Sequence, residues 1–251
     1  MRKLKRKANG ICIFCGTEGE ITDEHVFPEA WYPDDTPPDL WRWQAPACYK
    51  CNHDHYGMRE AKVFPFLAMT AEPHHPGAKG IAERAFRAAD QNAGKKPKDK
   101  KMRANLRELM AKRMEVVRSS DVPEGADYLG FRHQQDELLS TFVHEHDLLP
   151  VIGKIARGII YLDCGQRVDE RFTVRLFREL SKVPPMFLGM TATVTYSCGP
   201  GIVVDLVKIK PYPPISFMQI RIWDTHVWYA AVIPKPEYEE QIIAQGEPDE
   251  K

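Results

Sequence analysis

The spacing of apolar residues along the chain is irregular at first and becomes helical from about residue 81. Apolar positions recur at helical spacing over 81–89 and again over 106–114, which predicts two amphipathic helices. A third helix is expected over 153–161, and the segment 172–180 fits either a short helix or a strand. The middle of the chain is therefore expected to be mainly helical.

Beyond residue 190 the hydrophobic pattern alternates with a period of two. Polar or Gly/Pro-rich turns separate four β-rich runs, at 191–197, 202–209, 216–223 and 227–233. An antiparallel meander of about four strands is the simplest interpretation. Trp223, Trp228 and Tyr229 lie in these runs, where aromatic side chains are more often core than platforms for stacked bases.

The first 70 residues carry a different signal, two Cys-x-x-Cys pairs. The pairs are Cys12 with Cys15 and Cys48 with Cys51. Two such turns supply the four sulfur ligands of a tetrahedral structural zinc (Zn2+) site, whereas one pair alone is weak evidence. The spacing between the pairs is longer than is usual in zinc ribbons, and a proline-rich loop at 32–39 accommodates the excess.

Composition and charge narrow the class of protein. The 251 residues are 43% hydrophobic with a formal net charge of +0, which argues against a uniformly basic nucleic-acid wrapper. The chain has no apolar run long enough for a membrane span and no secretory signal pattern, so we expect a cytoplasmic protein without membrane contact. Basic blocks at 2–7 and 95–103 either contact phosphate or are solvated linkers, and the segment 236–250 is acidic.

These patterns predict an α+β protein in three parts. Residues 1–70 form the cysteine-rich module, and 71–135 form a helical, basic connector. Residues 136–251 form a C-terminal α+β unit with an antiparallel sheet, of unknown role.

The residues around the cysteine pairs form a recognisable order. Glu24-His25 with Pro28 lies between the pairs, and Asn52 and His55 follow the second pair. This order resembles the HNH nuclease family, especially its zinc-stabilised bacterial and phage members, over residues 11–60, with Gly57 and Glu60 continuing the pattern. The resemblance implies a ββα-metal (His-Me finger) module and a metal-dependent endonuclease that hydrolyses phosphodiester bonds in DNA, with RNA as an alternative substrate.

The resemblance also implies roles for individual residues. His25 matches the general base, because a neutral imidazole can take a proton from water near neutral pH. Glu24 and His55 match the ligands of a catalytic Mg2+ or Mn2+ ion, which would stabilise charge on the phosphate, and Asn52 belongs to the same catalytic set. Asp23 and His53 are the rival metal ligands.

The chain departs from the family in two places. Many members have an asparagine shortly before the third cysteine that orients the base histidine, and Gln44 stands nearest to that place here. The acid before His25 is Glu24 rather than the commoner aspartate, which changes its reach to a metal. A zinc-ribbon protein that binds nucleic acid without cutting it is the alternative function, but such a protein has no need of the Glu24, His25 and His55 set.

The other chemically suggestive residues are assigned no active role. The run His144-Glu145-His146-Asp147 is interpreted as a polar surface stretch rather than a metal site, because His-x-His on a helix points its rings apart. Lys154 and Arg157 are expected to be exposed helix charges, and Cys164 and Cys198 ordinary thiols.

Overall fold

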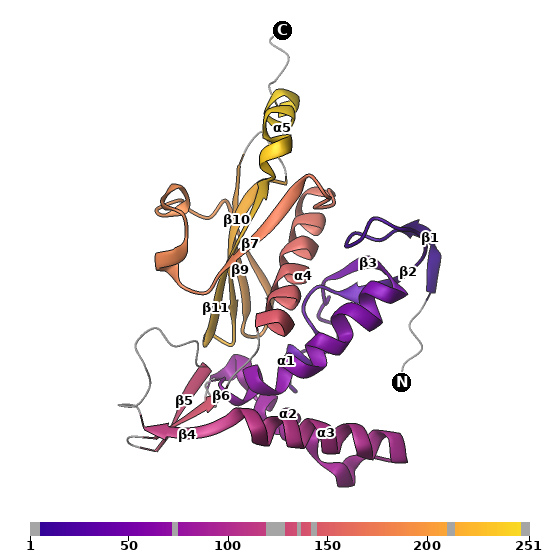
Figure 1. Ribbon diagram of the computed structural model, residues 1–251, viewed down its shortest axis with the longest axis vertical. Helices are drawn as coiled ribbons and strands as arrows, with labels where there is room; N and C mark the ends of the chain where they lie inside the picture. The colour runs from indigo at the N-terminus through magenta and orange to yellow at the C-terminus, as the bar shows by residue number, and fades with distance from the viewer. Residues whose placement is uncertain are drawn as a thin grey trace.

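The computed structural model describes residues 6–71, 75–118, 129–134, 137–141, 145–209 and 214–246. Within these residues the fold is α+β, with three antiparallel sheets and helices packed between and beside them (Figure 1). The predicted class is therefore confirmed at the level of helices with antiparallel sheets.

The cysteine-rich part is built on a small sheet in the order β1-β2-β3. Its strands are β1 (Arg6–Ile11), β2 (Glu18–His25) and β3 (Gln44–Cys48). A long loop with one short helical turn, Glu29–Trp31, connects β2 to β3. After β3 a π-helical segment, Lys50–Gly57, runs directly into helix α1 (Met58–Met69), whose second half is buried.

The next segment is only partly the helical connector that the pattern predicts. Helix α2 (Ile81–Ala89) has the predicted bounds, and helix α3 (Pro97–Arg113) contains most of the basic block 95–103. A third sheet in the order β4-β6-β5 then follows, where the sequence pattern suggested none. Its strands are β4 (Met114–Arg118), β5 (Leu129–Gln134) and β6 (Glu137–Thr141).

The C-terminal part is a five-stranded antiparallel sheet in the order β7-β11-β10-β9-β8. The four alternating runs form the predicted meander, and Phe172–Phe177 joins it at the edge as β7, which settles that segment as a strand. The other strands are β8 (Val194–Gly199), β9 (Ile202–Lys208), β10 (Ser216–Ile222) and β11 (His226–Pro234). Helix α5 (Glu239–Gly246) follows β11.

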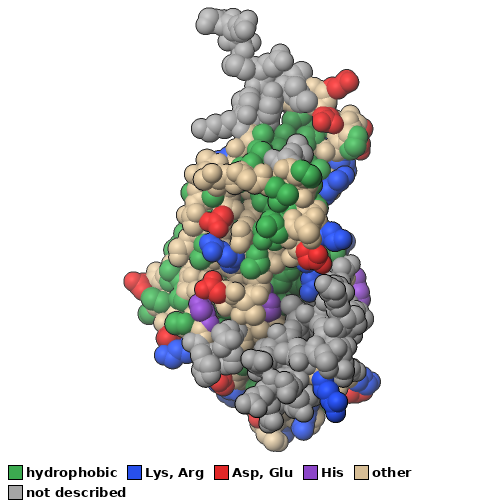
Figure 2. Space-filling model, turned by 90° about the vertical axis from the view of Figure 1, so that its left-hand side faces the viewer, with side chains coloured by type: hydrophobic (Ala, Val, Ile, Leu, Met, Phe, Trp, Pro, Cys, Tyr) green, Lys and Arg blue, Asp and Glu red, His purple; other side chains and the backbone are tan. Residues whose placement is uncertain are grey.

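The two faces of this sheet are covered differently. Helix α4 (Glu145–Cys164) packs on one face and also contacts β3 and α1, so it lies between the sheet and the cysteine-rich part (Figure 1). On the other face Val183 and Phe187 pack on Val207 and Phe217. Figure 2 shows that side of the molecule, where hydrophobic side chains run down the middle and charged side chains of both signs lie in small groups around them.

Beside two smaller clusters, one large hydrophobic core crosses all three predicted parts. It includes Phe27 beyond β2, Phe66 of α1, Ile155 of α4 and Ile220 of β10. The predicted division at residues 70 and 135 stays a prediction, but the packing gives no separate core to each part. Within the described ranges no helix is long and apolar enough to cross a membrane.

Candidate functional site

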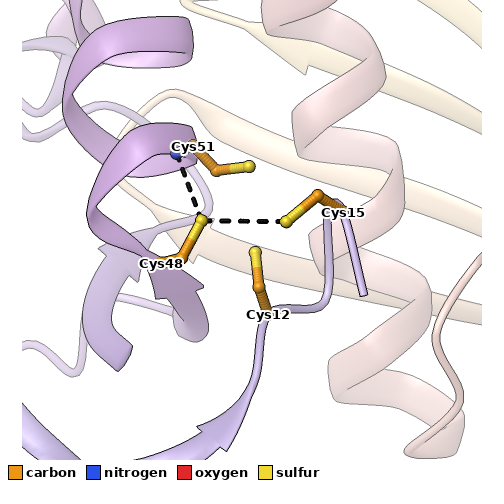
Figure 3. Close-up of side chains that lie close together, drawn as sticks. All are labelled: Cys12, Cys15, Cys48 and Cys51. Atoms are coloured by element: carbon orange, nitrogen blue, oxygen red, sulfur yellow. Dashed lines mark hydrogen bonds between the residues drawn. The ribbon is translucent and has the colours of Figure 1, made fainter. Parts of the chain in front are cut away.

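The four paired cysteines converge on one point (Figure 3). Cys12 and Cys15 lie in the turn after β1, Cys48 ends β3, and Cys51 lies in the π-helical segment. All four sulfur atoms lie within 4.8 Å of one another, and the Sγ atoms of Cys15 and Cys48 are 3.7 Å apart. Tetrahedral zinc with Zn–S bonds of about 2.3 Å requires sulfur separations of about 3.8 Å. The cluster can therefore bind a metal such as zinc.

Backbone hydrogen bonds hold the first cysteine pair against the second. The amide of Cys12 donates to the carbonyl of Thr17 at 3.0 Å, and the amide of Gly16 donates back to Cys12 at 2.9 Å. Gly16 has φ +75°, which a residue without Cβ adopts at low cost. The Ile13 amide donates to the Pro46 carbonyl of β3 at 3.0 Å, which ties the turn of the first pair to the strand that ends at Cys48.

The protonation of the thiols is set by their different exposure. Burial raises the pKa of Cys12 and of Cys51 above the ordinary value. Burial also acts to raise the pKa of Cys15, but hydrogen bonds with Thr17 prevail and lower it to about 6. A cation must therefore displace protons from the two buried thiols, which makes metal binding depend on pH.

The neighbouring residues Glu24 and His25 point to opposite faces of β2, as successive residues of a strand do. Glu24 is turned inward and is only 6% exposed, whereas His25 is half-buried and lines an open hollow. Asn52 fastens the helical segment to the same strand, because its Nδ2 donates to Thr22 Oγ1 at 2.9 Å and to the Asp23 carbonyl at 3.4 Å. The Asn52 amide is thus occupied in joining the helix to β2.

The hollow beside His25 has a volume of about 590 Å³, and its lining is mainly polar and aromatic. Gln44, the cross-strand partner of His25, places its Nε2 2.9 Å from His25 Nε2. Gln44, the residue nearest to the position of the family's asparagine, therefore contacts the histidine directly. The amide nitrogen donates, so the imidazole proton lies on Nδ1. The lining residues are His25, Glu29, Pro38, Asp39, Leu40, Trp41, Arg42 and Gln44.

The surroundings of His25 favour its neutral form. Burial lowers the pKa of His25 below its ordinary value, and the positive charges of Lys154 and Arg42 act in the same direction, while Glu29 opposes them. Arg42 also pairs with Glu29 at 2.8 Å across the hollow. A neutral imidazole beside a guanidinium is chemically suited to accepting a proton next to a bound anion.

Lys154 is the functional candidate that sequence reasoning missed. It was expected to be an exposed helix charge, but it is 0% exposed, and its Nζ donates to Oε1 of both Glu24 and Glu60. Burial alone would lower the pKa of Lys154, but the two carboxylates outweigh it and the pKa is raised. Burial raises the pKa of Glu24 to about 7 despite the ammonium group. The sequence signal was a lysine within the otherwise apolar run 148–156.

Among the described contacts, neither His55 nor His53 pairs with Glu24, Glu60 or Lys154. His55 lines a second hollow, about 320 Å³ in volume, with Tyr56, Gly153 and Arg157 among its walls. Its Nδ1 is 3.0 Å from Arg59 Nη1, and burial followed by the Arg59 charge lowers the pKa of His55. His53 stacks on Tyr49 with ring centroids 5.0 Å apart.

The residues implied as ligands of a catalytic metal do not fit a divalent ion in this arrangement. The Glu24 carboxylate accepts a hydrogen bond from Lys154, and His55 faces Arg59. In the part of the chain that the structure describes, the four cysteines are the only group of three or more His, Cys, Asp or Glu ligands close enough to share an ion. Glu24 and His55 thus lie outside the one group of clustered metal-ligand side chains among these residues.

The other described residues that the sequence singled out lie outside the cysteine cluster and the His25 hollow. Asp147 is buried and pairs with Lys62 at 3.5 Å, so it is not surface as expected, and His144 lies outside the described residues. Arg157 donates to the Val168 carbonyl at 2.7 Å. Cys164 and Cys198 lie outside the cysteine cluster. In the basic block 2–7, residues 2–5 lie outside the described residues, as do 247–250 of the acidic segment.

Comparison of the chain with protein-family models, with curated proteins and with solved structures finds no significant match in any of the three. The similarity to HNH nucleases consequently rests on the motif residues alone. Function has to be argued from the cysteine cluster and the His25 hollow.

Proposed function

We propose that this protein is a hydrolase acting on phosphodiester bonds of nucleic acid, an endonuclease of the HNH type with His25 as general base. DNA is the preferred substrate of the proposal, and RNA is the alternative. The observation that carries it is the neutral, half-buried His25 imidazole, which is hydrogen-bonded to Gln44 and opens into a hollow shared with Arg42.

The proposed chemistry uses the Nε2 lone pair of His25. Because the Gln44 amide donates to Nε2, the ring proton is held on Nδ1 and the lone pair at Nε2 is directed at a donor. A water that enters the hollow and replaces this donor would give its proton to Nε2 as it attacks phosphorus. Gln44 is in this account a positioning residue, because it selects the imidazole tautomer.

The hollow also carries groups suited to a nucleic-acid strand. Arg42 can pair with phosphate oxygens if its contact with Glu29 gives way. Trp41 is 64% exposed at the rim, with its ring 6.1 Å from that of Trp43, and an exposed indole is a platform for an unstacked base. A phosphate group at Arg42 and a nucleobase at Trp41 could thus both be held near His25.

Zinc fits the four cysteines, and its proposed role is structural. A bound zinc ion would cross-link the turn after β1, the end of β3 and the start of the helix. These elements flank the first half of β2, because Cys48 is the cross-strand partner of Ile21 and Cys12 follows Ile11, the partner of Glu18. The cross-link would therefore hold together the small sheet whose β2 strand ends at His25. The requirement for Mg2+ or Mn2+ stays an expectation of the family resemblance.

The alternative function is nucleic-acid binding without cleavage. One observation favours it: Glu24, the residue implied as a metal ligand, is buried and paired with Lys154. The exposed stack of His53 on Tyr49 would then serve as a second contact for bases. The two functions differ in whether His25 is needed for strand cleavage.

The deciding experiment compares His25→Ala with His146→Ala on supercoiled plasmid. We expect His25→Ala to lose nicking by at least about 10²-fold, the usual contribution of a general base, while zinc content, folding and DNA affinity stay near those of the wild type. His146→Ala is the matched control, because it removes an exposed histidine that lies outside the His25 hollow. Each protein is assayed with Mg2+, with Mn2+ and with neither.

Two results would contradict the proposal in different ways. Undiminished nicking by purified His25→Ala would remove His25 from the mechanism. A wild-type protein that binds DNA but cleaves neither DNA nor RNA under any of the three conditions would support the binding function instead.

A further inference from the structure

Three charged side chains from distant parts of the chain meet in the interior. Glu24 comes from β2, Glu60 from α1 and Lys154 from α4. Glu24 and Lys154 are buried and the Glu60 side chain is 16% exposed. Both carboxylates accept a hydrogen bond from the same ammonium nitrogen.

This arrangement needs a cation at its centre. Two carboxylates that converge in a poorly solvated space repel each other and lose hydration, so both stay ionised only beside a compensating positive charge. In many proteins a divalent ion meets this need by binding carboxylate oxygens. Here the Lys154 ammonium occupies the place between the two Oε1 atoms.

The fold leaves Lys154 little freedom to withdraw. Gly158, one turn further along α4, lies so close to the residue after β2 that an added Cβ would be 2.7 Å from a methyl carbon of Val26. Neighbouring positions of α4, including Val151 and Ile155, are fully buried. On the remaining side the Lys154 Nζ lies 5.9 Å from the centre of the Tyr56 ring, a favourable place for a cation.

We propose that Lys154 is the built-in cation of the Glu24 and Glu60 pair, so that this pair takes no divalent ion and α4 completes the site. The inference rests on the proposed function where it concerns the reaction: hydrolysis at His25 then proceeds without Mg2+ or Mn2+ at Glu24. Lys154 is a positioning residue, because it holds the carboxylate adjacent to His25 and thereby the end of β2. The competing account is that Lys154 gives way when a divalent ion arrives.

Direct measurement of Mn2+ binding separates these accounts without using activity. The full-length protein, loaded with zinc, is titrated with Mn2+, and free Mn2+ is measured by electron paramagnetic resonance. The variants are Glu24→Gln, Lys154→Met, and the double variant Lys154→Met with Glu24→Gln. Lys62→Met is the control, because Lys62 lies partly exposed and pairs with a different carboxylate, Asp147.

The expected pattern is specific. Wild type, Glu24→Gln and Lys62→Met should bind no Mn2+ at millimolar concentration, whereas Lys154→Met should gain one Mn2+ per chain and the double variant should lose it again. If Lys154→Met is unstable, Mn2+ should raise its melting temperature and should leave that of the double variant unchanged.

Two outcomes would overturn the inference. The first is Mn2+ binding by the wild type that Glu24→Gln abolishes, since Lys154 would then yield to the ion. The second is a Lys154→Met protein that neither gains Mn2+ nor is stabilised by it. If the wild type binds no Mn2+ and also fails to cleave nucleic acid, only the proposed function fails, and the role of Lys154 stands on the binding data.

Discussion

Two buried basic side chains differ in charge because of their neighbours: Lys154 is charged and His226 is neutral. Lys154 is kept charged by two carboxylates. His226 has no such partner among the described contacts: its Nε2 donates to the Leu67 carbonyl at 2.9 Å, and its ring lies between Trp223 and Trp228. Burial lowers the pKa of His226 to about 4, so this imidazole is neutral at physiological pH.

His226 should make the protein acid-sensitive. Its pKa is about 4 when folded and about 6.5 when unfolded, so its contribution to stability is complete above pH 6.5 and is lost as pH falls through 4. The loss should be roughly 3 kcal/mol in the free energy of unfolding. The side-chain amide that His226→Gln introduces can still donate to Leu67. Urea unfolding of this variant should show a free energy of unfolding that falls clearly less than that of the wild type as pH drops from about 6.5 to about 4.

His146→Gln is the matched control, because His146 is an exposed histidine. It should keep the wild-type dependence of stability on pH. A His226→Gln protein with an unchanged decline over this window would show that another group causes the acid sensitivity.

Some residues of the site were predictable and others were not, for a physical reason. The four cysteines could be identified because each pair is close in sequence and its ligand geometry is local. The Gln44 contact with His25 also follows from short-range strand pairing. Lys154 could not be identified, because its partner Glu24 is 130 positions away and only the packing of α4 brings them together.

At the scale of elements, α3 gives the basic block an unexpected form. The sequence suggested either phosphate contacts or a linker at 95–103, and most of the block forms the exposed first half of a helix. Among the described residues of α3 only Met110 is buried. A helix that is polar on nearly all sides presents its lysines to solvent and to any nearby phosphate.

Replacing Lys98, Lys100 and Lys101 together with glutamine tests this surface. If these lysines contact nucleic acid, affinity should fall similarly for all sequences, and the dependence of log affinity on log salt should flatten by roughly one unit per lost contact. Fluorescence anisotropy at several salt concentrations measures the slope. Lys112→Gln is the control on the same helix, since Lys112 pairs with Glu108 at 2.6 Å. Equal salt slopes for the wild type, the triple variant and this control would show that the block is a solvated face without phosphate contacts.

Elements with a clear period were predictable, and those without one were not. Helix α2 and the four strands of the meander follow from spacing alone. The pattern of α3 was extended to Met114, although the helix ends at Arg113 and β4 begins at once. The sheet β4-β6-β5 consists of short strands, for which a few residues give too little periodicity to identify a strand.

At the scale of the whole molecule, the cysteine cluster and the C-terminal sheet belong to one packed body. The indole of Trp223 donates to the Trp31 carbonyl at 2.8 Å, which joins the two parts directly. Helix α4 contributes apolar residues to the same core that contains α1 and the sheet. Loss of the metal should therefore also destabilise parts of the fold that lie far from the cysteines.

Cys48→Ser should lose zinc and lower the melting temperature of the whole chain in a single transition, because binding energy at such a site contributes to folding. Elemental analysis of the purified protein gives the metal content, and near-ultraviolet circular dichroism follows the buried tryptophans of the distant sheet. Cys164→Ser is the control, a thiol outside the cluster. Zinc retained in Cys48→Ser, or two separate transitions with the second unshifted, would contradict this expectation.

The uneven placement of the five tryptophans has an optical consequence. Trp31, Trp223 and Trp228 are buried and Trp43 is half-buried, whereas Trp41 stands in solvent at the rim of the His25 hollow. Water relaxes the excited state of an exposed indole, so the long-wavelength edge of the emission comes mainly from Trp41. The protein thus carries its own fluorophore beside the hollow, and occupancy there can be followed by light without a label.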